Sequence, residues 1–350
     1  MEILSANTTN PINRPVKVVQ FGEGNFLRGF ADYMIDIANE QGNFNGTIVL
    51  VKPREGGSLE KFHTQDCQYT VSLRGLVNGK PQVSNRQITC IADAVHAYEE
   101  YKKYMALAEI DTLRFVFSNT TEAGIVFDDT DQFELNPPKT FPGKLTKFLY
   151  HRYQTFHGNP DKGLIMLPTE LIDDNGIMLR KCVLQLIELW GLGEEFKNWV
   201  EEACIFTSTL VDRIITGYPK ATENEEWEKL GYIDRIMVTG EPFALWVIES
   251  AKDISSELPL PDAGLPVIYT DNQKPYKQRK VRILNGAHTS FVLASYLMGN
   301  DIVRDSMNDD DVRNFMMGIL HEEVIPTLSL PKADLEEFAD AVVARFNNPY

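Results

Sequence analysis

The chain has 350 residues, of which 34 are Lys or Arg and 50 are Asp or Glu, so its formal net charge is −16. Apolar residues make up 43% of the chain, enough for a full hydrophobic core, which excludes global disorder. The negative charge and the lack of a Lys/Arg stripe argue against a nucleic-acid partner, and no apolar run approaches the ~20 residues of a membrane span.

The cysteines are Cys67, Cys90, Cys182 and Cys204, far apart and without a Cys-x-x-Cys pair. This spacing predicts neither a disulfide framework nor a metal site. Since no signal segment is recognisable either, we expect a cytoplasmic enzyme that acts on a small molecule, with no membrane partner.

The chain opens with a pattern typical of a parallel sheet. Val16–Phe21 is a short apolar run that ends in glycine and predicts a buried strand. Apolar residues then recur at helical spacing from Phe26 to Gly42, where a helix is expected to end. Thr47–Val51 is a second buried strand, and strand, helix and strand in this order predict a parallel unit.

An antiparallel hairpin is predicted to interrupt this winding. Tyr69–Leu73 and Arg86–Ile91 have strand composition and flank an Asn78-Gly79 turn.

Helices and strands alternate after the hairpin. The pattern predicts, in chain order, helix Ala94–Ile110, strand Leu113–Ser118, helix Lys144–Phe156, strand Leu164–Leu167, helices Leu179–Trp190 and Glu194–Ala203, and strands Cys204–Ser208, Arg235–Thr239 and Ala244–Ile248. We therefore expect an α/β fold, with a Rossmann-like, doubly wound dinucleotide-binding domain over residues 14–255.

The last part of the chain predicts a different architecture. Ser255–Pro275 holds four of the 18 prolines and is interpreted as a linker, assigned to residues 256–275. Leu284–Leu297, Asp310–His321 and Ala333–Phe346 have helical periodicity. We expect a mostly α-helical substrate and catalytic domain over residues 276–350.

Gly22-Glu23-Gly24-Asn25 lies where the first strand meets the first helix. Two glycines allow backbone N–H groups to approach a pyrophosphate, which would face the positive end of the helix. Leu27 replaces the third glycine of the G-x-G-x-x-G pattern, so an ordinary glycine turn is the alternative. Arg28 is either a phosphate ligand or a solvated helix residue.

The end of the second strand carries Lys52-Pro53-Arg54 in place of the acidic residue that binds the adenosine ribose in NAD enzymes. A basic residue there favours the 2′-phosphate of NADP, unless Lys52 and Arg54 are surface residues of a loop.

Lys280, Asn285 and His288 are a set of residues suited to interconverting a carbonyl and an alcohol. A lysine transfers the proton if desolvation or a cation such as Arg282 lowers its pKa, an amide holds the developing alkoxide, and a histidine orients the hydroxyl. Lys280 is five residues before Asn285, about 140° away on an α-helix, so its side chain must curl or the helix must begin irregularly. The alternative is that all three are solvated or structural.

The spacing Lys280-x4-Asn285-x2-His288 resembles the signature of the mannitol dehydrogenase family of polyol-specific long-chain dehydrogenases/reductases. Five further blocks agree in order: Phe21–Arg28 (FGEGNFLR), Ser118–Gly124 (SNTTEAG), Val211–Ile214 (VDRI), Glu241–Glu249 (EPFALWVIE) and Arg345–Pro349 (RFNNP). Within the family, Val51–Arg54 and Leu167–Ile172 are similar to the branch that reduces D-tagaturonate to D-altronate.

The resemblance implies hydride transfer between a nicotinamide ring and a sugar-acid carbonyl without a metal. It implies that Lys280 is the general acid/base, Asn285 an oxyanion donor and His288 a substrate-orienting residue. Asp212 is implied at the same site, the alternative being a buried ion pair with Arg213. The implied cofactor-binding residues are Gly22, Gly24, Asn25, Phe26, Arg28, Lys52, Asn119 and Thr120.

The resemblance implies NAD as the cofactor in spite of Lys52, with NADP not excluded. A second oxyanion asparagine of mannitol dehydrogenase has no counterpart, because Thr169-Glu170-Leu171-Ile172 stands in its place. Either Glu170 has another role or a residue such as Asn175 is the donor.

Other functions remain open. D-fructuronate, which would give D-mannonate, and plain polyols are alternative substrates, and a non-catalytic dinucleotide-binding module is an alternative of another class. Family members continue past the Arg-Phe-x-Asn-Pro block, so the helical domain is expected to be incomplete. The cation for a substrate carboxylate is then Arg282 or a residue beyond the chain end.

Overall fold

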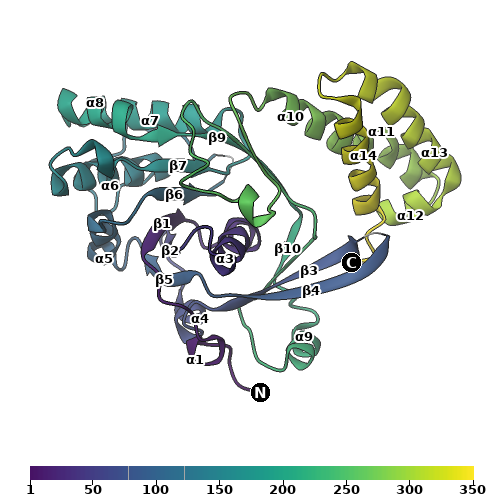
Figure 1. Ribbon diagram of the computed structural model, residues 1–350, viewed down its shortest axis with the longest axis horizontal. Coiled ribbons are helices and arrows are strands. Elements are labelled where there is room, and N and C mark those ends of the chain that lie inside the picture. The colour runs from purple at the N-terminus through teal and green to yellow at the C-terminus, as the bar shows by residue number, and fades with distance from the viewer. Residues whose placement is uncertain (78, 122) are drawn as a thin grey trace.

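The computed structural model describes residues 1–77, 79–121 and 123–350. Its main layer is a six-stranded parallel sheet (Figure 1). The strands lie in the order β5 (Ile91–His96), β2 (Thr47–Lys52), β1 (Val16–Phe21), β6 (Phe115–Ser118), β7 (Ile165–Pro168) and β8 (Ile205–Phe206). The chain winds outward from β1 in both directions, which confirms the doubly wound sheet.

Helices cover both faces of this sheet (Figure 1). The helices of one face are α5 (Tyr101–Ala106), α6 (Phe141–Thr155), α7 (Asn175–Leu189) and α8 (Glu194–Ala203). The opposite face carries the helix that follows β1, made of α2 (Asn25–Leu27), a π-helical turn (Arg28–Asp32) and α3 (Tyr33–Glu40). Val19 faces the core under α5–α8, whereas Val18 faces the core under α2 and α3. Strand β1 is therefore apolar on both sides.

The remaining strands form two smaller sheets. One contains β10 (Ile215–Gly217), β11 (Val238–Gly240), β3 (Tyr69–Val77) and β4 (Lys80–Ile88), and the other contains β13 (Val267–Thr270), β12 (Leu245–Glu249) and β9 (Ser208–Asp212). The predicted hairpin is confirmed, since β3 and β4 pair antiparallel. Asn78 of its expected turn lies outside the described residues.

The helical part contains α10 (Lys274–Arg279), a π-helical turn (Lys280–Asn285), α11 (Gly286–Leu297), α12 (Val303–Asn308), α13 (Asp310–Gly318), a second π-helical turn (Ile319–Val324) and α14 (Lys332–Phe346). It packs on β12, whose residues alternate between two cores. Val247 contacts the helical core, whereas Trp246 belongs to the core beneath the main sheet. Figure 1 shows α14 descending to the tip of the β3–β4 hairpin.

The remaining helices are short: α1 (Ala6–Thr9), α4 (Glu60–Thr64) and α9 (Glu223–Leu230). In the described residues, no helix has the length and apolar character needed to cross a bilayer.

The prediction of a helix over Ala94–Ile110 is wrong for its first residues. Ala94 and Val95 lie in β5, which pairs parallel with β2, and α5 begins only at Tyr101. Both residues are fully buried. A short apolar run has no clear period, so its pairing with the sheet edge was not evident from sequence.

The interpretation of Ser255–Pro275 as a linker is also wrong. The segment contains β13, which pairs with β12, and Leu258 and Leu260 are fully buried in the core beneath the main sheet. Pro261 begins a short 3-10 helix and Pro275 lies in the first turn of α10, so the prolines belong to a packed segment, and their density alone did not reveal the burial of its leucines.

Replacing Leu260 by Ala should therefore lower the free energy of unfolding by about 2–5 kcal/mol, because it opens a cavity in the core. The exposed Asp262, two residues away, is the matched control, and Asp262→Ala should change stability by less than about 0.5 kcal/mol. Urea unfolding measures both, and equal small effects would show that the segment is not packed.

Candidate active site

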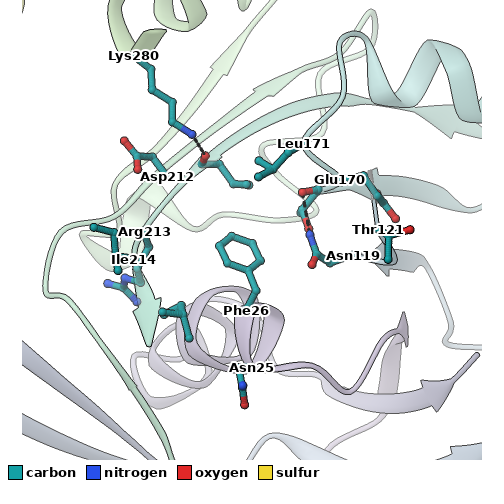
Figure 2. Close-up of a pocket in the computed structure, with 13 residues that line it drawn as sticks. Asn25, Phe26, Asn119, Thr121, Glu170, Leu171, Asp212, Arg213, Ile214 and Lys280 are labelled. Carbon is teal, nitrogen blue, oxygen red and sulfur yellow. Dashed lines mark hydrogen bonds between the residues drawn. The ribbon is translucent and has the colours of Figure 1, made fainter. Parts of the chain in front are cut away.

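A cavity of about 580 Å³ lies at the carboxyl ends of the strands, between the glycine turn and the helical part (Figure 2). Its lining residues are Asn25, Phe26, Asn119, Thr121, Thr169, Glu170, Leu171, Val211, Asp212, Arg213, Ile214, Ile215 and Lys280. Figure 2 shows the ring of Phe26 between Lys280 and the helix that carries it. In doubly wound folds this edge of the sheet is where ligands bind.

The glycine turn has the geometry of a phosphate-binding loop. Gly22 has φ +122° and donates its N–H to Val51 O at 2.9 Å, and a Cβ there would lie 3.1 Å from Asn119 O. A side chain is therefore excluded at Gly22. Gly24 has open space where its Cβ would point, so an anion can approach the N–H groups that begin the helix at Asn25. These features fit a pyrophosphate.

Arg28 makes structural contacts, and its expected contact with a phosphate stays a prediction. It is buried and donates to the carbonyl oxygens of Glu23 and Ile236 and to Asn25 Oδ1. Its guanidinium also lies over the ring of Tyr69. Each of its three nitrogens donates to a protein oxygen, so Arg28 stabilises the turn.

Lys52 ends β2 and lies close to the turn. Its Nζ is 3.4 Å from Glu23 Oε1, and its side chain is only 11% exposed. Arg54 in the following loop is exposed. Lys52 is thus a paired, nearly buried cation and not a surface residue.

The end of β6 forms the opposite wall. Asn119 donates to Thr169 O at 2.9 Å, and the backbone N–H of Thr120 donates to Glu170 Oε1 at 3.0 Å. Glu170 also accepts from Ser118 Oγ, and burial raises the pKa of its carboxyl. Glu170 therefore fixes the loop after β6, which is a structural role.

Asn175 cannot serve as the second oxyanion donor. Its Nδ2 donates to the carbonyl oxygens of Pro168, Glu170 and Thr209, and its Oδ1 accepts from two backbone N–H groups. All of its hydrogen-bonding capacity is used to join β7, β9 and α7.

The spacing of Lys280 and Asn285 is explained by the π-helical turn that spans them. In a π-helix, residues five apart in sequence lie on the same side. Such π-helical turns are rare and are often found at functional sites. Both residues line a second cavity of about 760 Å³ that adjoins the first. The expected irregular helix start is therefore present.

Lys280 is placed for proton transfer. Its Nζ donates to Val211 O at 2.8 Å (Figure 2). Burial lowers the pKa of Lys280, and the positive charge of Arg345 lowers it further, whereas Asp212 opposes the shift. The prediction that Arg282 is the cation that lowers this pKa is wrong, because its exposed side chain donates to Thr327 Oγ1 at 3.1 Å.

Asp212 forms a buried ion pair, but its partner is Arg345 and not Arg213. Arg345 of α14 donates to both oxygens of Asp212 at 3.0 and 2.9 Å and to both oxygens of Glu241 at 2.9 and 2.8 Å. The three side chains are 4–6% exposed. We call this set the Asp212–Arg345–Glu241 bridge.

Neither Arg345 nor Glu241 was predicted as a site residue, although both lie in sequence blocks that carry the family resemblance. Arg213 instead donates to the carbonyl oxygens of Gly29, Pro242 and Phe243, and so holds the loop after β11.

His288 lies on α11 and is exposed. Its ring contacts the rings of Phe291 and Phe346, with centroids 5.9 and 6.2 Å away. It is not among the residues that line either cavity, so its substrate-orienting role stays a prediction.

Residues 16–261 match the Mannitol dehydrogenase Rossmann domain, and residues 272–350 match the Mannitol dehydrogenase C-terminal domain. The chain belongs to the mannitol dehydrogenase family.

Several relatives are named altronate oxidoreductase. The protein from Phocaeicola vulgatus is 44% identical over 350 residues, which is 100% of this chain and 73% of the relative. The Bacillus subtilis protein is 44% identical over 336 residues, 96% of this chain and 70% of the relative. The protein from Escherichia coli O7:K1 is 45% identical over 337 residues, which is 96% of this chain and 70% of the relative.

Two solved structures share the fold. A D-sorbitol dehydrogenase in substrate-free form has a TM-score of 0.82 at 24% identity and matches 99% of this chain and 75% of its own. The mannitol 2-dehydrogenase of Pseudomonas fluorescens, in a ternary complex with NAD and D-mannitol, has a TM-score of 0.78 at 23% identity and matches 99% and 74%. These likenesses confirm the fold of a Rossmann-like domain followed by a helical domain.

Arg345→Met should lower the free energy of unfolding by about 3–5 kcal/mol at pH 7, because it leaves two buried carboxylates without their cation. This loss in the free energy of unfolding should be smaller at lower pH. Burial already raises the pKa of Glu241, and loss of Arg345 raises it further, so protonation relieves the penalty as pH falls.

Urea unfolding at pH 7 and pH 5 measures this effect. Arg313→Met, which removes an exposed pair with Asp310 on α13, is the matched control and should cost less than about 1 kcal/mol at either pH. Equal losses in the two variants would show that the bridge does not hold the helical part.

Proposed function

We propose that the chain is an NAD-dependent oxidoreductase that interconverts D-tagaturonate and D-altronate. The observation that carries the proposal is the desolvated Lys280 on the wall of a cavity whose other side is the phosphate-binding turn. The names of the relatives from three organisms support the sugar-acid substrate.

The chemistry divides between the dinucleotide and the chain. A bound nicotinamide dinucleotide supplies or takes the hydride. Lys280 takes the hydroxyl proton during oxidation and returns it during reduction, and burial, which lowers its pKa, favours the neutral amine that oxidation requires. The Asn285 amide donates to the oxygen that gains negative charge, and Asp212 balances the charge of protonated Lys280.

Basic residues around the second cavity support a substrate with a carboxylate. Lys274, Lys277 and Arg282 line it together with Lys280. Lys277 is paired with Asp173, so Lys274 and Arg282 are the candidates to bind the acid group.

Location in the cytoplasm belongs to the same proposal. All four cysteines are buried and unpaired, as expected in a reducing compartment.

Lys280→Ala should lose most turnover while keeping NADH affinity, because the lysine transfers a proton but lies away from the phosphate-binding turn. Loss of a general acid/base typically costs about 10²–10⁴-fold in kcat. NADH consumption with D-tagaturonate, D-fructuronate and a ketose gives turnover, and fluorescence titration gives the dissociation constant of NADH.

Lys332→Ala, on the exposed start of α14, removes the same side chain away from the cavity and should leave both quantities unchanged. Normal turnover in Lys280→Ala would refute the role of the lysine. NADH binding without turnover of any of the three substrates by the unaltered protein would favour a non-catalytic module.

A further inference from the structure

The residue at the end of β2 has the opposite charge to the one expected for an NAD-binding Rossmann fold. In Rossmann folds that use NAD, an acidic residue at this position accepts a hydrogen bond from the adenosine ribose, whereas a cation there accommodates the 2′-phosphate of NADP. This chain has the cation, Lys52. A free Lys52 would predict NADP.

Lys52 is not free. Its Nζ lies 3.4 Å from Oε1 of Glu23, the residue between the two glycines of the phosphate-binding turn. A Cβ on Gly57 would lie 3.1 Å from Lys52 Cε and 3.3 Å from Nζ, so the loop after β2 passes closely over the end of the lysine. The ammonium is therefore confined between this loop and Glu23.

The loop itself is held in place. His96, which is paired in register with Lys52 on the neighbouring strand β5, contacts Gly56 O through Nε2 at 3.2 Å. Glu99 lies 3.8 Å from the same imidazole nitrogen. A second carboxylate, that of Glu99, therefore lies beside the imidazole that contacts this loop.

The Glu23 carboxylate has one oxygen that is available to a ligand. Oε1 is occupied by Lys52, and Oε2 accepts no hydrogen bond from any residue within 1–77, 79–121 and 123–350. The side chain is 27% exposed, so Oε2 is within reach of a ligand. Glu23 thus combines a free acceptor with a carboxylate that neutralises the neighbouring lysine.

We propose that Glu23 selects NAD over NADP by supplying, from the phosphate-binding turn, the carboxylate that is missing at the end of β2. Oε2 accepts a hydrogen bond from the ribose 2′-hydroxyl, while Lys52 fixes the carboxylate in place. A 2′-phosphate meets the negative charge of Glu23 and finds the nearby cation already paired. This inference rests on the proposed use of a nicotinamide dinucleotide.

Glu23→Gln tests the assignment, because it removes the charge and keeps the shape. Lys52 is then free to pair with the 2′-phosphate, and one charge-assisted hydrogen bond corresponds to roughly 10- to 100-fold in affinity. NADPH should bind roughly 10- to 100-fold more tightly than to the unaltered protein, and NADH several-fold more weakly. Fluorescence titration with NADH and NADPH measures both dissociation constants without turnover.

Three control variants isolate the cause. Glu55→Gln removes an exposed charge from the same loop and should leave the ratio of the two constants unchanged. Glu23→Asp keeps the charge and should keep the preference for NADH. Adding Lys52→Met to Glu23→Gln should abolish the gain in NADPH affinity.

The outcomes separate this inference from the proposed function. If the unaltered protein binds NADPH more tightly than NADH, the proposed NAD dependence is wrong. If it prefers NADH and Glu23→Gln gives the same ratio as Glu55→Gln, the NAD dependence stands and Glu23 does not select the cofactor.

Discussion

One guanidinium, that of Arg345, joins the two halves of the molecule at the active site. It binds Asp212 at the end of β9 and Glu241 just after β11, and both acids are almost completely buried. The bridge therefore sets where α14 meets the nucleotide-binding part. Burial lowers the pKa of Lys280, and Asp212, which lies beside the lysine, raises it, so the bridge that joins the two parts also affects the lysine.

The charges around Lys280 form a balanced set. When Lys280 is protonated, Lys280 and Arg345 contribute two positive charges, and Asp212 and Glu241 contribute two negative charges. A buried set of this kind is weak evidence for stability, because apolar residues often stabilise a fold equally well. Its value lies in positioning and in electrostatics: Arg345 holds Asp212 at a fixed place, and Asp212 partly offsets the desolvation that lowers the pKa of Lys280.

The sequence predicted what depends on local pattern and missed what depends on distant contacts. Val16–Phe21 and Glu194–Ala203 have the predicted bounds, since periodicity and a following glycine or strand define them. Ala94 was misassigned because only its pairing with β2 makes it a strand. Lys280 and Asn285 were predicted from residue type, spacing and the family resemblance together, and the π-helical turn supplies the irregular geometry that the spacing required. The partner of Asp212 was missed because Arg345 lies 133 residues away in sequence.

The bridge and burial together determine the direction in which the pKa of Lys280 shifts. The most direct test is the pH dependence of kcat/KM for altronate oxidation in the unaltered protein and in Asp212→Asn. Oxidation needs neutral Lys280, so the rate rises with pH and levels off above its pKa. Asp212 raises that pKa, so its neutralisation should move the rising limb to lower pH. An unmoved limb, or a shift to higher pH, would contradict the account.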